Sequence, residues 1–114
     1  MIEPRLASGV LISSLIRRVE ARGGHGMVLF KGDAIAGGIV VAVLDRGRPL
    51  RLLERTHDLD GRAKWQPVGP QAIEKEQEIS EYLARRRRVD PDMWAIELDI
   101  ADGERFADEM IASG

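Results

Sequence analysis

The chain has 114 residues, of which 44% are hydrophobic and 32% charged, and it carries a formal net charge of −2. This length and composition predict one globular domain that spans residues 1–114, and they exclude a disordered chain. The chain contains no cysteine, which excludes disulfides, thiolate nucleophiles and cysteine-ligated metal sites.

No segment of the sequence is expected to cross a membrane. The longest apolar run, residues 37–44, is far shorter than the roughly 20 residues that a membrane-spanning helix needs. Near the start of the chain, Glu3 and Pro4 stand where a secretory signal peptide has its basic region. We therefore expect a cytoplasmic protein that makes no contact with a membrane.

The first predicted element is an amphipathic helix over residues 7–22. Its apolar residues recur at helical spacing and form one stripe that would be buried. These residues are Leu11, Ile12, Leu15, Ile16 and Val19. Ser8 is the expected N-cap, and Gly23 supplies the left-handed residue that ends the helix.

Four strand-like runs follow the helix and are separated by turn residues. They cover residues 27–31, 39–44, 50–57 and 62–66. The second run is apolar at every position, which is typical of a central strand buried on both faces. The pair Asp60-Gly61 between the last two runs indicates a hairpin. Connections this short join antiparallel neighbours, so we expect a four-stranded meander.

The C-terminal part is predicted to hold a second helix and a fifth strand. The helix covers residues 71–88, with glutamates in its first half and four arginines at its end, which suits the helix macrodipole. Residues 93–100 alternate between large apolar and small or acidic side chains, the pattern of a half-buried strand. The tail after Gly103 is expected to form one helical turn through Phe106 and Met110.

These elements predict an α+β fold in the order α-β-β-β-β-α-β. The expected architecture is an antiparallel meander sheet of about five strands with two helices packed on one face. That arrangement would leave the other face of the apolar run 39–44 uncovered. A second copy of the chain would cover it, so this strand predicts a homodimer.

The most prominent charged feature is a run of four arginines near the end of the second helix. Successive residues of a helix point about 100° apart, so the four side chains cannot all face one surface. One hypothesis is an anion or nucleic-acid site to which the first helix contributes two further arginines. The residues of this site would be Arg85, Arg86, Arg87, Arg88, Arg17 and Arg18. The alternative, which the negative net charge favours over nucleic-acid binding, is a solvated helix end with local ion pairs.

Three neighbouring residues, His57, Asp58 and Asp60, are weak candidates for metal binding. The further ligands of a calcium loop are missing at the required spacing, and turn formation alone accounts for both aspartates. We therefore expect no metal. An enzyme that uses His57 with the two aspartates is a separate hypothesis, although no Gly-x-Ser-x-Gly motif is present.

The sequence shows no motif for a cofactor. The stretch from Gly23 to Gly26 is rich in glycine, but it joins a predicted helix to a strand, whereas a phosphate loop runs from a strand into a helix. No set of nucleophile, base and orienting group can be assembled from the sequence either. We therefore expect no cofactor and lean towards a protein without enzymatic activity.

Several short motifs give the chain a family resemblance. They are Glu3-Pro4-Arg5-Leu6, Arg17-Arg18-Val19-Glu20, Asp58-x-Asp60-Gly61, Trp65-x-Pro67, and the block from Tyr82 to Trp94 with its four arginines and Asp90-Pro91-Asp92. From Glu3 to Phe106 the chain resembles the alphaproteobacterial family known as domain of unknown function 1491. The resemblance implies a small bacterial protein and brings no activity, ligand or catalytic residue with it.

Three functional hypotheses follow from the sequence. The first is a non-catalytic module that binds a ligand or a protein partner of unknown identity. The second is anion or nucleic-acid binding through the arginine cluster, which would weaken steeply with salt. The third is an unrecognised enzyme, which requires His57 and its neighbouring aspartates to converge in a cleft.

Overall fold

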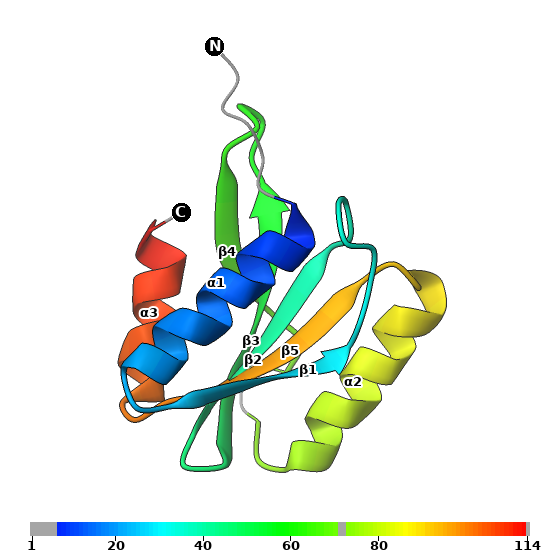
Figure 1. The fold of residues 1–114 in the computed structure, drawn as a ribbon. Coiled ribbons are helices and arrows are strands. Elements are labelled where there is room, and N and C mark those ends of the chain that lie inside the picture. Colours follow the sequence, from blue (N-terminus) through cyan, green and yellow to red (C-terminus); the bar gives the residue numbers. More distant parts are fainter. Residues whose placement is uncertain (1–6, 71–72, 114) are drawn as a thin grey trace.

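The computed structural model describes residues 7–70 and 73–113, which form three helices and five strands (Figure 1). In chain order these are α1 (Ser8–Ala21), β1 (His25–Phe30), β2 (Ile39–Asp45), β3 (Arg48–His57), β4 (Ala63–Val68), α2 (Glu76–Val89), β5 (Trp94–Asp99) and α3 (Gly103–Ser113). Every element predicted from the sequence is present, and the expected turn in the tail is a full helix. The helix predicted over residues 71–88 begins too early, because residues 73–75 are not helical and α2 begins at Glu76; residues 71 and 72 lie outside the described residues.

The strands form one mixed sheet in the order β1-β5-β2-β3-β4. β5 lies between β1 and β2, antiparallel to β1 and parallel to β2, so the prediction of a purely antiparallel meander is wrong. The long connection that a parallel pair needs is the chain between β2 and β5, residues 46–93, which includes β3, β4 and α2. The central position also explains why β5 is buried on both faces over most of its length and not half-buried as expected.

The helices cover both faces of the sheet. α1 and α3 pack on one face and α2 packs on the other, so the prediction of two helices on one face is wrong (Figure 1). The reason is visible in β2, where Ile39–Leu44 are buried at every position and therefore need cover on each side. The helices of the same chain cover both faces of β2. The argument for a homodimer, which assumed that one face of this strand is uncovered, therefore no longer holds.

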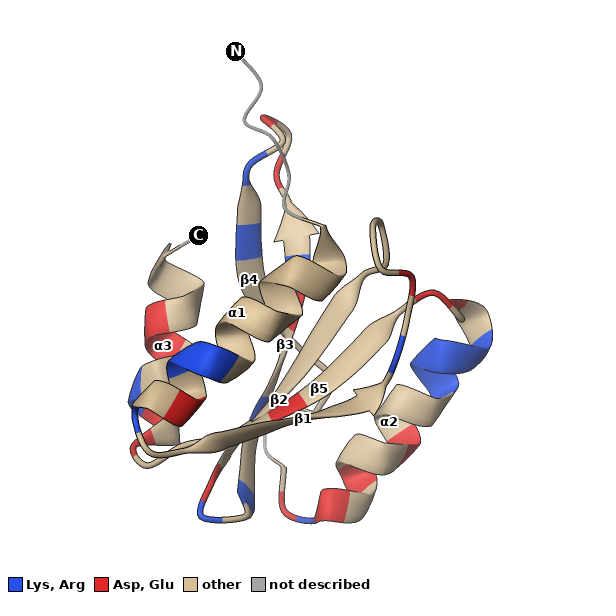
Figure 2. Ribbon diagram, in the orientation of Figure 1, with Lys and Arg blue, Asp and Glu red and all other residues tan. Residues whose placement is uncertain are grey.

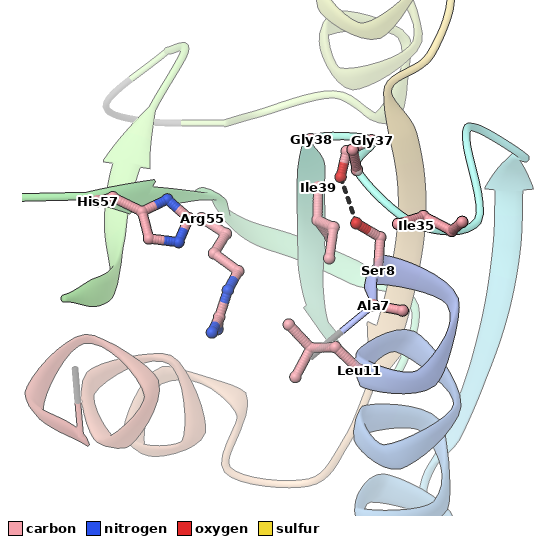
Figure 3. Close-up of a pocket in the computed structure, with 10 residues that line it drawn as sticks. Ala7, Ser8, Leu11, Ile35, Gly37, Gly38, Ile39, Arg55 and His57 are labelled. Atoms are coloured by element: carbon pink, nitrogen blue, oxygen red, sulfur yellow. Dashed lines mark hydrogen bonds between the residues drawn. The ribbon is translucent and has the colours of Figure 1, made fainter. Parts of the chain in front are cut away.

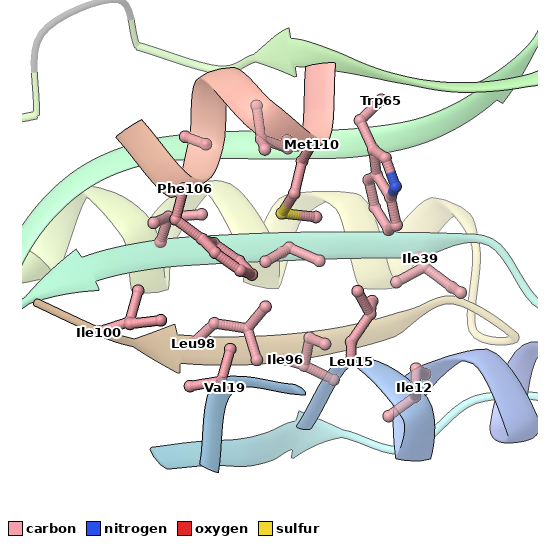
Figure 4. Packing of buried hydrophobic residues seen from close by; sticks show 14 of the residues in the cluster. Ile12, Leu15, Val19, Ile39, Trp65, Ile96, Leu98, Ile100, Phe106 and Met110 are labelled. Carbon is pink, nitrogen blue, oxygen red and sulfur yellow. The ribbon is translucent and has the colours of Figure 1, made fainter. Parts of the chain in front are cut away.

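The larger of two hydrophobic clusters lies between the sheet and the pair α1 and α3 (Figure 4). From α1 it includes Leu15 and Val19, and from α3 it includes Phe106 and Met110, which meet the alternating residues of β2 and β5. The smaller cluster lies under α2, where Ile79 and Leu83 pack on the opposite side chains of the same strands. In the described part of the chain, none of the helices has the length and apolar character that a bilayer span requires.

Candidate functional site

The four consecutive arginines of α2 divide into two pairs. The Arg86 guanidinium donates hydrogen bonds to both carboxylate oxygens of Glu54 on β3 and to the Tyr82 hydroxyl, the latter over 2.8 Å. The hydrogen bonds that Arg86 donates to Glu54 raise the pKa of Arg86. Arg87 lies over the Phe30 ring, with its guanidinium carbon 4.7 Å from the ring centroid. Arg85 and Arg88 are exposed, so they are the members of the run that face solvent.

Arg17 and Arg18 do not join this group. They belong to α1, which covers the opposite face of the sheet from α2. Figure 2 shows the basic residues of α1 and α2 as separate areas. The structure therefore does not bring the six arginines together into the single basic surface that the sequence suggested. Anion binding by the exposed pair on α2 stays a prediction.

Replacing Arg86 by alanine is expected to lower the free energy of unfolding by about 2 kcal/mol, because the partly buried Glu54 carboxylate would lose its partner. Urea denaturation at neutral pH measures this loss. The matched control is Arg85→Ala, which changes an exposed neighbour on the same helix and should shift stability by at most about 0.5 kcal/mol. Equal losses in the two variants would contradict a structural role for Arg86.

The candidate metal ligands on the β3–β4 hairpin form a turn. Oδ1 of Asp58 accepts the backbone N–H groups of Asp60 and Arg62, both at 2.9 Å, and Gly61 adopts a φ of 80°. These bonds are the turn chemistry that the sequence suggested for the aspartates. Within residues 7–70 and 73–113 no three histidine, aspartate or glutamate side chains are placed to hold a metal ion.

His57 directly precedes this turn, and its side chain lies at the rim of a pocket on the α1 face of the sheet (Figure 3). The pocket has a volume of about 470 Å³. Its walls come from the first turn of α1, the loop before β2, the start of β2 and the end of β3. The residues that line it include Ser8, Leu11, Ile35, Ile39, Arg55 and His57.

Hydrogen bonds hold the wall formed by residues 33–38. Oδ1 of Asp33 accepts the N–H groups of Ile35 at 2.9 Å and Ala36 at 2.8 Å, and these bonds lower the pKa of Asp33. The indole N–H of Trp94 donates to the Asp33 carbonyl over 2.7 Å. The buried Ser8 hydroxyl donates to the Gly37 carbonyl over 2.5 Å, which ties the start of α1 to this loop. Ser8 is thus the first residue of α1 and not its N-cap, a position that Ala7 takes.

Arg55 is the basic side chain inside the pocket. It is partly buried, and its guanidinium carbon lies 5.7 Å from the centroid of the Trp65 ring. Removal from water lowers the pKa of Arg55. Among the described residues, no carboxylate lies within ion-pair distance of its guanidinium. The pocket therefore presents a partly desolvated positive charge beside apolar side chains.

Residues 6–108 match the family described as "Protein of unknown function (DUF1491)". The chain belongs to this family. Similar solved structures include a crystal structure of a DUF1491 protein from Caulobacter crescentus, with 36% identity, coverage of 87% of this chain and 92% of that chain, and a TM-score of 0.75. An NMR structure of a family member from the same bacterium has 33% identity, 89% and 91% coverage, and a TM-score of 0.77.

A third similar structure, a solution structure of a protein from A. tumefaciens, has 31% identity, covers 84% of this chain and 86% of that chain, and gives a TM-score of 0.71. No curated protein matches the chain. The resemblance drawn from the sequence motifs is confirmed, and DUF1491 carries no assigned function.

Sequence reasoning on this DUF1491 chain singled out His57 but missed Arg55. The sequence could have indicated Arg55, because residues 55 and 57 are two apart in a strand and therefore project from the same face as each other. Across the hairpin Arg55 pairs with Trp65, a ring on which a guanidinium can lie. What the sequence did not contain was the position of α1 and the loop 33–38, which turn this face of β3 into a pocket.

Proposed function

We propose that this DUF1491 protein is a non-catalytic binding module that holds a small anion with an apolar part, such as a carboxylate or a phosphate monoester, in the α1 pocket. The observation that carries the proposal is Arg55, a partly buried cation with no carboxylate partner among the described residues. The proposal includes the cytoplasmic location that was expected from the sequence.

Arg55 fits an anion for two reasons. A charge that loses water without gaining an oppositely charged partner costs free energy, and a bound anion would recover that cost through charge-assisted hydrogen bonds. The Trp65 ring also holds the guanidinium in one orientation, so less side-chain entropy is lost on binding.

The rest of the pocket fits an apolar ligand body. Leu11, Ile35 and Ile39 contribute aliphatic side chains to its walls. Mostly apolar walls with a few polar groups are typical of small-molecule sites. A ligand that carries one acidic group and a short hydrocarbon part would match both features.

Binding without catalysis is supported by the hydrogen bond that the hydroxyl of Ser8, a residue lining the pocket, already makes. The Ser8 hydroxyl donates its proton to the Gly37 carbonyl, and an activated nucleophile would instead donate to a base. Ser8 therefore acts here as a structural link between α1 and the loop.

The test is a titration, followed by amide NMR shifts, with three ligands of six carbons each: hexanoate, hexyl phosphate and uncharged hexanamide. Either anion should shift the signals of Ser8, Gly37 and Gly38, and hexanamide should not. Arg55→Gln should weaken anion binding by about tenfold or more, because one charge-assisted contact is lost. Its matched control is Arg62→Gln, an exposed arginine on the same hairpin.

Equal binding of hexanoate and hexanamide, or equal affinity of Arg55→Gln and Arg62→Gln, would overturn the proposal. Residues 1–6, which the structure does not describe, contain one carboxylate, Glu3. The variant Glu3→Gln is therefore titrated in parallel, and tighter anion binding in it would identify Glu3 as an internal competitor for Arg55.

A second candidate function is polyanion binding by Arg85 and Arg88, which are both exposed on α2. The double variant Arg85→Ala/Arg88→Ala should abolish any salt-dependent binding to heparin or RNA while it leaves the fold intact. A double change at Arg86 and Arg87 is unsuitable for this test, because both side chains already have partners. Unchanged binding in the first variant would exclude this function.

A further inference from the structure

β1 has one open edge. It is the outermost strand of the sheet and pairs only with β5 among the described strands. Residues 25–30 contain no proline, lysine or arginine, the residues with which proteins usually protect an edge strand. The outermost strand at the other end, β4, contains both Lys64 and Pro67. The irregularity in β1 lies between Val28 and Phe30, so its first four residues keep a regular register.

The open edge carries exposed apolar side chains. Met27 and Val28 have 52% and 42% of their surface exposed. Met27 pairs with Glu97 of β5, and paired residues of neighbouring strands project from the same side of the sheet. Met27 therefore stands next to Glu97 on the side that α2 covers.

A groove runs beside this edge, between α2 and the sheet. It has a volume of about 210 Å³. Leu29 and Phe30 of β1 form one wall, and Ile79 and Leu83 of α2 form the other. The groove is thus an apolar cleft that continues the exposed surface of β1 toward α2.

The side chain of Glu97, from β5, lies on the sheet side of this groove. It belongs to a central strand, is partly buried, and has no basic side chain within ion-pair distance among the described residues. Burial raises the pKa of Glu97, and the nearby carboxylates of Glu76 and Asp99 add to the effect, while His25 opposes it. Glu76 also lines the groove. The cleft is therefore acidic, and Glu97 has no ion-pair partner among the described residues.

We propose that the edge of β1 and the groove beside it form a docking site for an extended basic segment of a partner protein. The segment adds one strand to the sheet along residues 25–28, and a lysine or arginine side chain enters the groove and pairs with Glu97. Strand addition at an open edge is an established mode of peptide recognition, with alternate side chains reaching pockets. This site lies on the α2 side of the sheet, so it is independent of the Arg55 pocket.

A second copy of this chain fits the same edge less well. Its own β1 would bring no lysine or arginine to Glu97, since residues 25–30 have none. A two-fold pairing of β1 with β1 would also place two acidic grooves at one junction, where like charges repel. Charge complementarity therefore selects a basic partner segment.

The test uses three short synthetic peptides, with alternating valine and lysine, alternating valine and glutamate, and alternating proline and lysine. The valine–lysine peptide should shift the amide signals of residues 25–28 and slow their hydrogen exchange. The valine–glutamate peptide lacks the positive charge. In the proline–lysine peptide every second residue has no N–H and a fixed φ of about −65°, which favours an isolated polyproline II helix over an added strand, so neither peptide should bind there. Glu97→Gln should lower the affinity for the valine–lysine peptide by about tenfold, and Arg55→Gln should leave this affinity unchanged.

A stability measurement separates docking from a structural role for Glu97. Because its pKa is raised in the folded state, Glu97 costs stability at neutral pH, and this cost disappears once the pH falls below its ordinary pKa. Glu97→Gln should therefore melt at a higher temperature at pH 7 while it binds the peptide more weakly. A lower melting temperature would assign Glu97 to the framework of the fold and overturn the proposal.

Three other outcomes would also overturn it. They are the absence of amide shifts in β1 at millimolar valine–lysine peptide, equal binding of the proline–lysine peptide, and slow exchange of the β1 amides in a protein that sediments as a dimer. The last result would assign the edge to a second copy of the chain.

Discussion

Replacement of Phe106 by alanine should lower the free energy of unfolding by about 4 kcal/mol. The Phe106 side chain is 1% exposed and lies in the cluster that joins α3 to α1 and the sheet. Its loss would leave a cavity between three elements that cannot all close on it. The guanidinium carbons of Arg18 and Arg22, 5.9 and 5.4 Å from the ring centroid, would lose their contact as well.

Urea denaturation followed by circular dichroism measures this effect. A loss of about 4 kcal/mol is a large share of the stability of an ordinary domain, so the variant should be partly unfolded at physiological temperature. The control is Leu59→Ala on the β3–β4 hairpin, where the leucine is fully exposed and its removal should change stability by at most about 0.5 kcal/mol. A loss below about 1 kcal/mol in Phe106→Ala would mean that α3 is not part of the core.

Gly37→Ala should lower the free energy of unfolding by about 3 kcal/mol, because a side chain at this position would overlap the backbone of Asp92 and Asp33. A Cβ at Gly37 would lie 2.2 Å from the Asp92 carbonyl oxygen and 2.9 Å from that of Asp33. Neither atom can move away cheaply, since the loop 33–38 is tied to the start of β5 by the bond from Asp33 N–H to the same Asp92 oxygen. The carbonyl of Gly37 also accepts the Ser8 hydroxyl, so the pocket should be distorted together with the loop.

The adjacent residue provides the control for this prediction. A Cβ at Gly38 would meet nothing closer than the Asp90 carboxylate oxygen at 3.9 Å, which is an ordinary contact. Gly38→Ala should therefore keep both the stability and the hexanoate binding of the parent protein, whereas Gly37→Ala should lose both. If the two variants unfold at the same urea concentration, the loop does not pack on residue 92 as the structure shows.

Local patterns in the sequence predicted the elements well. The spacing of Leu11, Leu15 and Val19 marked α1, and the unbroken apolar run of β2 marked a strand buried on both faces. These patterns report which side of an element is buried, because side-chain direction follows from the period of the helix or strand. They do not report which element provides the cover, and for this reason the side of the sheet taken by α2 was predicted wrongly.

The candidate sites depended still more on distant contacts. Glu54 and Arg86, which are far apart in the chain, meet because α2 lies across β3, so half of the arginine run is engaged in packing and pairing. Arg55 becomes a pocket residue because α1 and the loop 33–38 stand opposite β3. Glu97 lies near an open edge, without an ion-pair partner among the described residues, because β5 enters between β1 and β2.

The amino-acid sequence by itself determined the helices and strands, the double burial of β2, the hairpin at Gly61 and membership of the DUF1491 family. The tertiary structure alone decided the order of the strands, the helix layer on each face, and which charged groups lose water without an oppositely charged partner among the described residues. The physical reason is that periodicity and turn chemistry act within a few residues, whereas strand order and desolvation arise from contacts between segments far apart in the chain.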